Sequence, residues 1–153
     1  MTAAITAQLA PGHVGLNVTD LARSVDFYRR ALGFEQIHVS SDGDRKFAFL
    51  GLDGTLRLTL WEQSDGSFSA KTPGLHHLAF LVPTIDQVRA AEAALKELGV
   101  PFAYDGVVVH AEGMSSGGIF FTDPDGIRLE IYVADGAEAQ PSPHGAAPAC
   151  GFF

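Results

Sequence analysis

The residues of this chain best suited to bind a metal ion are two histidines and a glutamate, each placed at or within an apolar segment. His13 precedes "VGLNV", His77 precedes "LAFLV", and Glu130 lies inside "IRLEIYV". Imidazole nitrogens and a carboxylate oxygen are suitable ligands for Fe(II), Mn(II), Zn(II) or Ni(II). Such a triad leaves coordination positions open for substrate and water, which would permit metal-assisted catalysis.

These side chains can converge only if the three segments are β-strands with a consistent orientation. In a strand, neighbouring side chains point to opposite faces. His13 then lies on the face opposite the apolar residues that follow it, and Glu130 lies opposite the apolar set of its own segment. In "LHHLAFLV", His76 falls on the apolar face and His77 on the other. We therefore expect His13, His77 and Glu130 to share one surface, whereas an isolated strand histidine is commonly structural.

The same series of elements is predicted twice along the chain. Residues 13–33 and 77–99 each show a strand, a turn and an amphipathic helix that ends at a glycine. Three further strands follow in each half, with turns predicted at residues 53–54 and 123–126. The expected fold is α+β, with two βαβββ modules over about residues 11–63 and 74–133.

The two modules are expected to form one domain over residues 1–133. From residue 134 the chain is rich in Ala, Pro and Gly without a period, which predicts a flexible tail over residues 134–153. Phe152 and Phe153 either remain solvated or dock on the body or on a partner chain. Cys150 is expected to be an inert thiol, unless the tail folds over the metal site and brings it near the ion.

Composition excludes several function classes. The formal net charge of −8 gives no electrostatic attraction to nucleic acid or to anionic membranes. No apolar run approaches the roughly 20 residues of a membrane span, and the N-terminal segment lacks the basic start of a signal sequence. One cysteine allows no intrachain disulfide. We expect a cytoplasmic protein with a small-molecule substrate and no membrane or nucleic-acid partner.

Three motifs, "GHVGLNVTDLARSVDFYRRALGFE", "LHHLAFLVPTID" and "FFTDPDGIRLEIYV", resemble those of the vicinal oxygen chelate superfamily. This superfamily includes glyoxalase I, extradiol dioxygenases, fosfomycin-resistance enzymes and bleomycin-binding proteins. The resemblance implies paired βαβββ modules that form a cup-shaped mixed sheet around a metal ion, within a homodimer. It places the ligands on His13, His77 and Glu130. It also implies that the ion chelates oxygens of a small, oxygen-rich metabolite.

Departures from subfamily patterns leave the reaction open. Glyoxalase I relatives carry a fourth ligand on the last strand of the first module. We expect Arg57 at this position, which cannot coordinate a cation, and Glu62 could serve only if the register shifts, so a standard glyoxalase I activity is not expected. Fosfomycin thiol transferases carry a threonine at the position of Gly15. Extradiol enzymes commonly carry a tyrosine at the position of Phe120. Lyase, isomerase and dioxygenase chemistry therefore all stay open.

The surface that carries the ligands predicts a substrate pocket. Arg57 could bind a carboxylate or phosphate, Trp61 could stack on an aromatic group, and His110 is a candidate acid or base. Surface or packing roles are the alternative for each. The full set of predicted pocket residues is Asn17, Arg57, Thr59, Trp61, Arg128 and Tyr132.

A binding protein that sequesters a hydrophobic or cationic drug, like the bleomycin-binding members, is the alternative function. Those members typically lack the metal ligands, so the retention of all three favours an enzyme.

Overall fold

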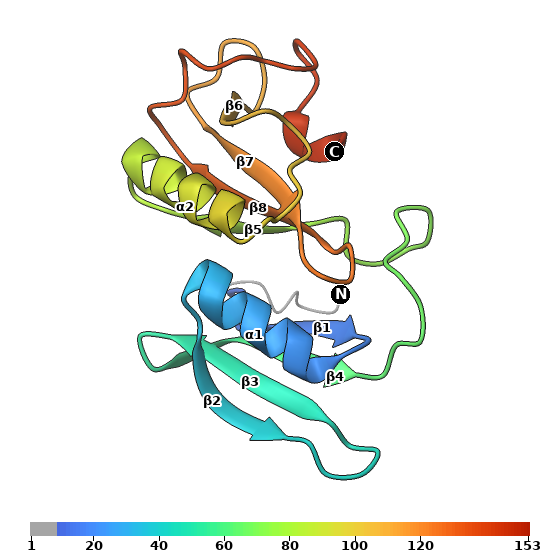
Figure 1. Cartoon of the computed structure of the whole chain (residues 1–153). Helices are drawn as coiled ribbons and strands as arrows, with labels where there is room; N and C mark the ends of the chain where they lie inside the picture. The colour runs from blue at the N-terminus through green and yellow to red at the C-terminus, as the bar shows by residue number, and fades with distance from the viewer. Residues whose placement is uncertain (1–8) are drawn as a thin grey trace, which may run out of the picture. The chain divides into compact units, whose positions relative to one another are not determined.

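The computed structural model describes residues 9–153 of the chain, which divides into two compact units, Met1–Asp65 and Gly66–Phe153. Each unit contains a four-stranded sheet of parallel and antiparallel strands with one helix packed on it (Figure 1). The α+β class and the order of one strand, one helix and three strands in each half are confirmed. Within the described residues, no helix combines the length and apolar character that crossing a membrane requires.

The first unit has its strands in the order β1-β4-β3-β2. β1 runs parallel to β4, and the other neighbouring strands are antiparallel. Its elements are β1 (Val14–Val18), α1 (Leu21–Leu32), β2 (Glu35–Ser40), β3 (Phe47–Leu52) and β4 (Thr55–Glu62).

The second unit repeats this plan with the order β5-β8-β7-β6, and β5 runs parallel to β8. A short 3₁₀ helix, η1, follows the sheet near the end of the chain. The elements are β5 (Leu78–Leu81), α2 (Ile85–Glu97), β6 (Val108–Val109), β7 (Gly117–Thr122), β8 (Arg128–Val133) and η1 (Ala149–Gly151).

Local sequence signals set the ends of both helices. Asp20 caps α1, because its carboxylate accepts a hydrogen bond from the backbone N–H of Arg23 at 2.9 Å. Gly33 ends this helix with a φ of 73°, a left-handed conformation that glycine adopts without strain. Thr84 and Gln87 form a reciprocal capping box at the start of α2.

The two predicted turns are also present. Asp53 and Gly54 join β3 to β4 with φ values of 50° and 71°, as a two-residue hairpin turn requires. In the loop between β7 and β8, the Asp123 carboxylate accepts hydrogen bonds from the backbone N–H groups of Asp125 and Ile127, each at 2.9 Å. The second turn fixes the start of β8, the strand that carries Glu130.

The faces of the strands follow the predicted alternation. Leu58 and Leu60 of β4 are buried, as are Leu129 and Ile131 of β8, and these residues form the core beneath each helix. Burial of this apolar surface is the main favourable contribution to the stability of each unit. The intervening residues of the two strands therefore point to the opposite face of their sheets.

In the second unit, this opposite face is covered by the segment that follows β8. Val108, Phe120 and Ala149 form a buried cluster there, with Cys150 and Phe153 packed against it. Hydrogen bonds fix the path of the segment: the N–H of Val109 donates to Pro141 O at 3.0 Å, and the N–H of Glu112 donates to Gly145 O at 2.8 Å. The predicted flexibility of residues 134–153 stays a prediction, but their placement against the sheet is specific.

Gly118 allows β7 and β8 to approach closely where they carry the buried face. A Cβ at this position would overlap the carbonyl oxygen of Ile131 and lie 2.7 Å from the Cα of Tyr132. Both neighbours are backbone atoms of the paired strand, so they cannot move aside as a flexible side chain would.

We expect Gly118→Ala to lower the free energy of unfolding by at least about 2 kcal/mol, within the range found for overpacked sites. Gly66→Ala is the control, because a Cβ there meets no atom within 4 Å. Chemical denaturation of both variants measures the effect. Equal stability of the two variants would contradict the close approach of β7 and β8.

Glu62, at the end of β4, connects this strand to the start of α1. One of its carboxylate oxygens accepts a hydrogen bond from the N–H of Leu21 at 2.7 Å, and the other binds Lys46 Nζ at 2.8 Å. The hydrogen bond from Lys46, followed by that from Leu21, lowers the pKa of Glu62 below its usual value of 4.5. The carboxylate therefore lies on the helix side of the sheet and lines a groove of about 670 Å³ beside α1.

Glu62→Gln is expected to lower the stability of the protein near neutral pH. Because the carboxyl has a lowered pKa in the folded state, its contribution is present above pH 4.5 and is lost as the pH falls through the folded value. The stability difference from the wild type should therefore shrink in acid. Denaturation from pH 7 to pH 3 measures this, with the exposed Glu97→Gln as a control; a constant difference would contradict the assignment.

Candidate metal centre

Glu130 lies in the middle of β8 and is almost completely buried. It pairs with Ala79 of β5 on one side and with Phe120 of β7 on the other, and it is 2 % exposed. A carboxylate in such a position is costly to bury unless it has charged or hydrogen-bonding partners. Its partners therefore define the candidate site.

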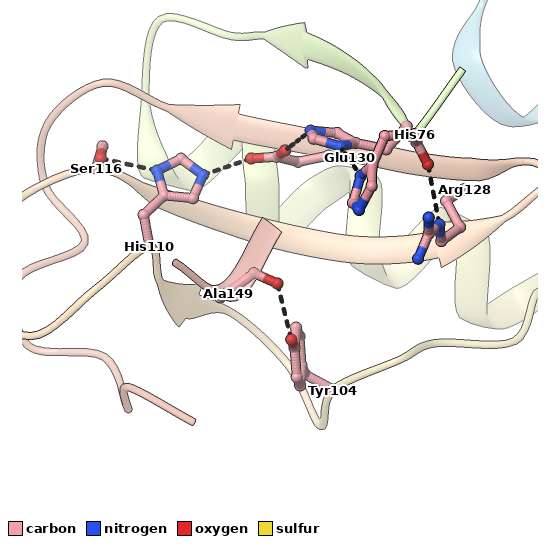
Figure 2. Close-up of polar contacts among 8 residues, drawn as sticks. His76, Tyr104, His110, Ser116, Arg128, Glu130 and Ala149 are labelled. Atoms are coloured by element: carbon pink, nitrogen blue, oxygen red, sulfur yellow. Dashed lines mark hydrogen bonds and ion pairs between the residues drawn. The ribbon is translucent and has the colours of Figure 1, made fainter. Parts of the chain in front are cut away.

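Two imidazoles contact the Glu130 carboxylate, one at each oxygen (Figure 2). His77 Nε2 lies 3.3 Å from Oε2, and His110 Nε2 lies 2.5 Å from Oε1. His110 Nδ1 is in turn 2.8 Å from the hydroxyl of Ser116. Because an ionised carboxylate only accepts hydrogen bonds, His110 carries its proton on Nε2, and in the neutral ring Nδ1 accepts from Ser116.

His77, rather than His76, reaches Glu130, as predicted. The predicted position of His76 on the apolar face is wrong, because both histidines precede β5, where strand alternation does not apply, and His76 is exposed. His76 instead contacts the far side of the neighbouring ring, with the two Nδ1 atoms 2.8 Å apart. If His77 Nε2 is the ligand atom, its proton is on Nδ1 and is donated to His76, which is the outer hydrogen bond that metal-binding histidines usually make. The carbonyl oxygen of His76 accepts a hydrogen bond from Arg128 Nε at 2.9 Å, which anchors this segment to β8.

The electrostatics of His77 suit a ligand. Burial lowers the pKa of His77 below its usual value of 6.5, and the charge of Glu130 opposes that effect only in part. The imidazole is therefore neutral near pH 7, which leaves a lone pair for coordination.

Cys150 joins His77 and Glu130 in one cluster. The thiol sulfur, one imidazole nitrogen and one carboxylate oxygen all lie within 4.8 Å of one another. Ligand atoms around a zinc-sized ion are separated by roughly 3.3–3.8 Å, given bonds of about 2.0–2.3 Å. This donor set fits a divalent metal ion. Burial, followed by the negative charge of Glu130, raises the pKa of the Cys150 thiol.

The remaining pocket residues of the second unit have structural contacts of their own. Arg128 Nη1 donates to Phe153 O at 2.6 Å, and its guanidinium lies 5.6 Å from the ring centres of Phe68 and Phe153. Tyr132 is half-buried, with its ring centre 5.4 Å from that of His110. Both side chains border the Glu130 cluster, and their contact with a substrate stays a prediction.

The first unit carries its predicted residues on the equivalent strands. His13 is exposed immediately before β1, and Arg57 is exposed on β4. Asn17 pairs with Trp61 in the register of β1 and β4, and its side-chain oxygen accepts a hydrogen bond from the N–H of Gln63 at 3.0 Å. Whether His13 completes the ligand set of the second unit stays a prediction.

The strand registers correct the expected position of a fourth ligand. Gly15 pairs with Thr59 in the first unit as Ala79 pairs with Glu130 in the second, so Thr59, rather than Arg57, is the counterpart of Glu130. Thr59 is buried and accepts a hydrogen bond from Trp61 Nε1 at 3.0 Å. A neutral hydroxyl is a poor substitute for a carboxylate ligand. The alternative ligand Glu62 is engaged on the helix side of the sheet.

Sequence reasoning missed the contact between His110 and Glu130. His110 follows β6, whose residues pair with Gly117 and Gly118 of β7, and its N–H donates to Ser116 O. A β6–β7 hairpin in the sequence "VVVHAEGMSSGG" was the available signal. No local signal placed Cys150, because its position depends on the packing of the whole segment after β8.

Comparison with known proteins identifies the family. The model for the "Glyoxalase/Bleomycin resistance protein/Dioxygenase superfamily" matches residues 10–131. A catechol-2,3-dioxygenase of Bacillus subtilis is 30% identical over 125 residues, 80% of this chain, but the chain spans only 40% of that relative. A trivalent organoarsenical cleaving enzyme of Bacillus sp. (strain MD1) is 28% identical over 132 residues, 86% of this chain and 78% of the relative.

Solved structures show the same fold. A glyoxylase/bleomycin resistance protein/dioxygenase domain from Frankia sp. EAN1pec has a TM-score of 0.72 and 26% identity, covering 84% of this chain and 93% of that one. The fosfomycin resistance protein FosX from Listeria monocytogenes, complexed with Mn(II) and sulfate, has a TM-score of 0.61 and 24% identity, covering 85% and 93%. With the family model matching most of the chain, these findings show that the protein belongs to the glyoxalase/bleomycin resistance protein/dioxygenase superfamily.

Proposed function

We propose that this protein is an enzyme that depends on a divalent metal ion and acts on a small, oxygen-rich metabolite. His77 and Glu130 would hold the ion together with His13, leaving positions for two oxygens of the substrate. The observation that supports this most directly is the buried Glu130 carboxylate, which contacts one imidazole through each oxygen and lies in a compact group of donor atoms. When bound, the ion would act as a Lewis acid that stabilises negative charge on the substrate.

The residues around the ligands would fix the protonation state and orientation of the site. Ser116 holds the tautomer of His110, and His110 holds one oxygen of Glu130, leaving the other oxygen toward His77. His110 would thus act mainly as a positioning residue. By fixing the orientation of the Glu130 carboxylate, it would support metal affinity. His110 also stays the candidate acid or base, because its imidazole lies next to the ligand cluster.

The first unit would contribute substrate contacts. Arg57 could bind an anionic group of the substrate through its guanidinium. Trp61 is held in place by its hydrogen bond to Thr59 and by stacking on Phe47, with ring centres 5.3 Å apart. A fixed indole of this kind could orient an aromatic or planar substrate.

The names of the related proteins favour two kinds of reaction: oxygenation, from a catechol-2,3-dioxygenase, and bond cleavage, from organoarsenical cleaving enzymes. On β7, Phe120 pairs with Glu130 and occupies the position where extradiol enzymes commonly carry a tyrosine, so it lacks the hydroxyl of that residue. We therefore favour a metal-dependent lyase, or an oxygenase that has Phe120 in place of this tyrosine, over an enzyme that cleaves catechol.

A second candidate is a non-catalytic protein that sequesters a drug. The aromatic cluster of Phe47, Phe49 and Trp61 favours it, with centres of the two phenyl rings 5.2 Å apart and all three side chains half-buried. Such a cluster could bind a planar ligand without a metal ion, and the net charge of −8 would accept a cationic one.

Protein purified without a chelator is expected to contain a divalent metal ion in a stoichiometric amount. Glu130→Gln keeps the shape of the side chain but removes its charge, so we expect metal affinity to fall at least about 100-fold, since the loss of even an outer-shell partner costs about 10–100-fold. His13→Ala should also weaken binding, because it removes the third proposed ligand. Elemental analysis and competition with a metal-sensitive dye measure both effects.

Glu97→Gln, on the exposed end of α2, is the matched control for the removal of a carboxylate. It should leave metal content unchanged. Folded wild-type protein that binds no divalent ion would exclude the proposed enzyme.

Thermal shift with a ligand panel distinguishes the two candidate functions. For the enzyme, we expect oxygen-chelating metabolites to raise the Tm only when metal is present, because their oxygens would bind through the ion. A chelator should abolish this shift. A Tm increase by planar cationic drugs that a chelator does not change, and that Trp61→Ala removes, would instead support sequestration.

A further inference from the structure

The segment after β8 brings the only cysteine of the chain to the candidate metal centre. Ala149 is fixed on both sides. Its N–H donates to His110 O at 2.6 Å. Its carbonyl oxygen accepts from the Tyr104 hydroxyl at 2.8 Å, as Figure 2 shows. Cys150 is the next residue. Its backbone position is therefore fixed through Ala149, which is hydrogen-bonded to His110, the residue that itself contacts Glu130. Its position does not depend on the thiol finding a partner.

Phe153, two residues after the end of η1, packs on the same surface. The ring of Phe153 lies 5.7 Å from that of His77 and 4.9 Å from that of Phe120, measured between centres. Arg128 Nη1 donates to Phe153 O at 2.6 Å, which ties the segment to β8 two residues before Glu130. Contacts on both sides of Cys150 thus hold this part of the chain against His77 and Glu130.

We propose that Cys150 is a metal ligand, so that the second unit alone supplies an imidazole, a carboxylate and a thiolate to the ion. This inference rests on the proposed function, because it requires that His77 and Glu130 bind a metal. His77 and Glu130 are already at a ligand-like separation of 3.3 Å, and the sulfur lies within 4.8 Å of both donors. Coordination requires the three donors to move closer together, to the roughly 3.3–3.8 Å that separates ligand atoms around a zinc-sized ion.

A thiolate ligand has two consequences for this site. It shifts metal preference toward Zn(II) and Co(II) and away from Mn(II) and Mg(II), because sulfur is a soft donor and the latter ions prefer oxygen. It also occupies one coordination position of the ion. In a site with only histidine and carboxylate ligands, that position is open to water or substrate. The segment from Ala149 to Phe153 would then be part of the metal centre, and a substrate would bind beside the thiolate or displace it.

Packing alone is the competing explanation. Cys150 is half-buried and packs against the cluster of Val108 and Phe120, and a free cysteine often serves as a small apolar residue. The two explanations differ in what they predict for a bound metal, since a packing thiol gives no bond from sulfur to the ion.

Co(II) substitution tests the proposal directly. Because the chain has one cysteine, any sulfur-to-cobalt charge-transfer band in the near ultraviolet must come from Cys150. We expect this band in the wild type and its loss in Cys150→Ser, with the visible cobalt bands altered but present. Cys150→Ser combined with Ala146→Cys restores a thiol at an exposed position of the same segment and should not restore the band.

Metal competition gives a second readout. Cys150→Ser should weaken Zn(II) binding about 10-fold or more while changing Mn(II) binding by less than about 3-fold. For a readout that needs no substitution, alkylation of Cys150 in the wild type should slow when Zn(II) is added. Thermal unfolding of the variants establishes that they are folded.

The outcomes separate this proposal from the proposed function. Co(II) that binds the wild type without a charge-transfer band, with Zn(II) affinity equal in Cys150→Ser, would overturn the role of Cys150 and leave the enzyme proposal standing. Folded wild type that binds neither ion would overturn both.

Discussion

The burial of one carboxylate, that of Glu130, is the constraint on which the second unit depends. A charge in the middle of a strand, between two neighbouring strands and 2 % exposed, is stable only with partners that offset its loss of hydration. His77 and His110 provide them, one at each oxygen. The apolar core of this unit lies on the other face of the same strand, so the fold itself holds the carboxylate in place.

The duplicated architecture shows how such a site can differ between two copies of one plan. Thr59 occupies in the first unit the register position of Glu130 in the second, and it is buried as well. A hydroxyl needs only one hydrogen bond to be buried, which Trp61 supplies. The first unit thus carries an aromatic surface and an exposed arginine where the second carries a cluster of ionisable side chains, which suits substrate contact in the one and metal binding in the other.

The second unit also differs by the chain that follows its last strand. Residues 134–153 cover the Glu130 face with hydrogen bonds to the β6 region and with the ring of Phe153, which packs on Phe120. This covering lowers the local exposure of His77, and burial is the main cause of its lowered pKa. The neutral imidazole and the enclosed carboxylate are therefore products of the same packing.

The sequence by itself determined the βαβββ repeat, the helix caps, the turns and the orientation of His77 and Glu130. These follow from the alternation of strand side chains and from capping and turn residues, which act over a few positions. Only the tertiary structure decided that His110 binds Glu130, that Thr59 is its counterpart in the other sheet, and that Cys150 lies beside the ligands. Those facts depend on strand register and on the path of segments that have no periodic sequence pattern. The contacts join residues 20 or more positions apart, which no local pattern connects.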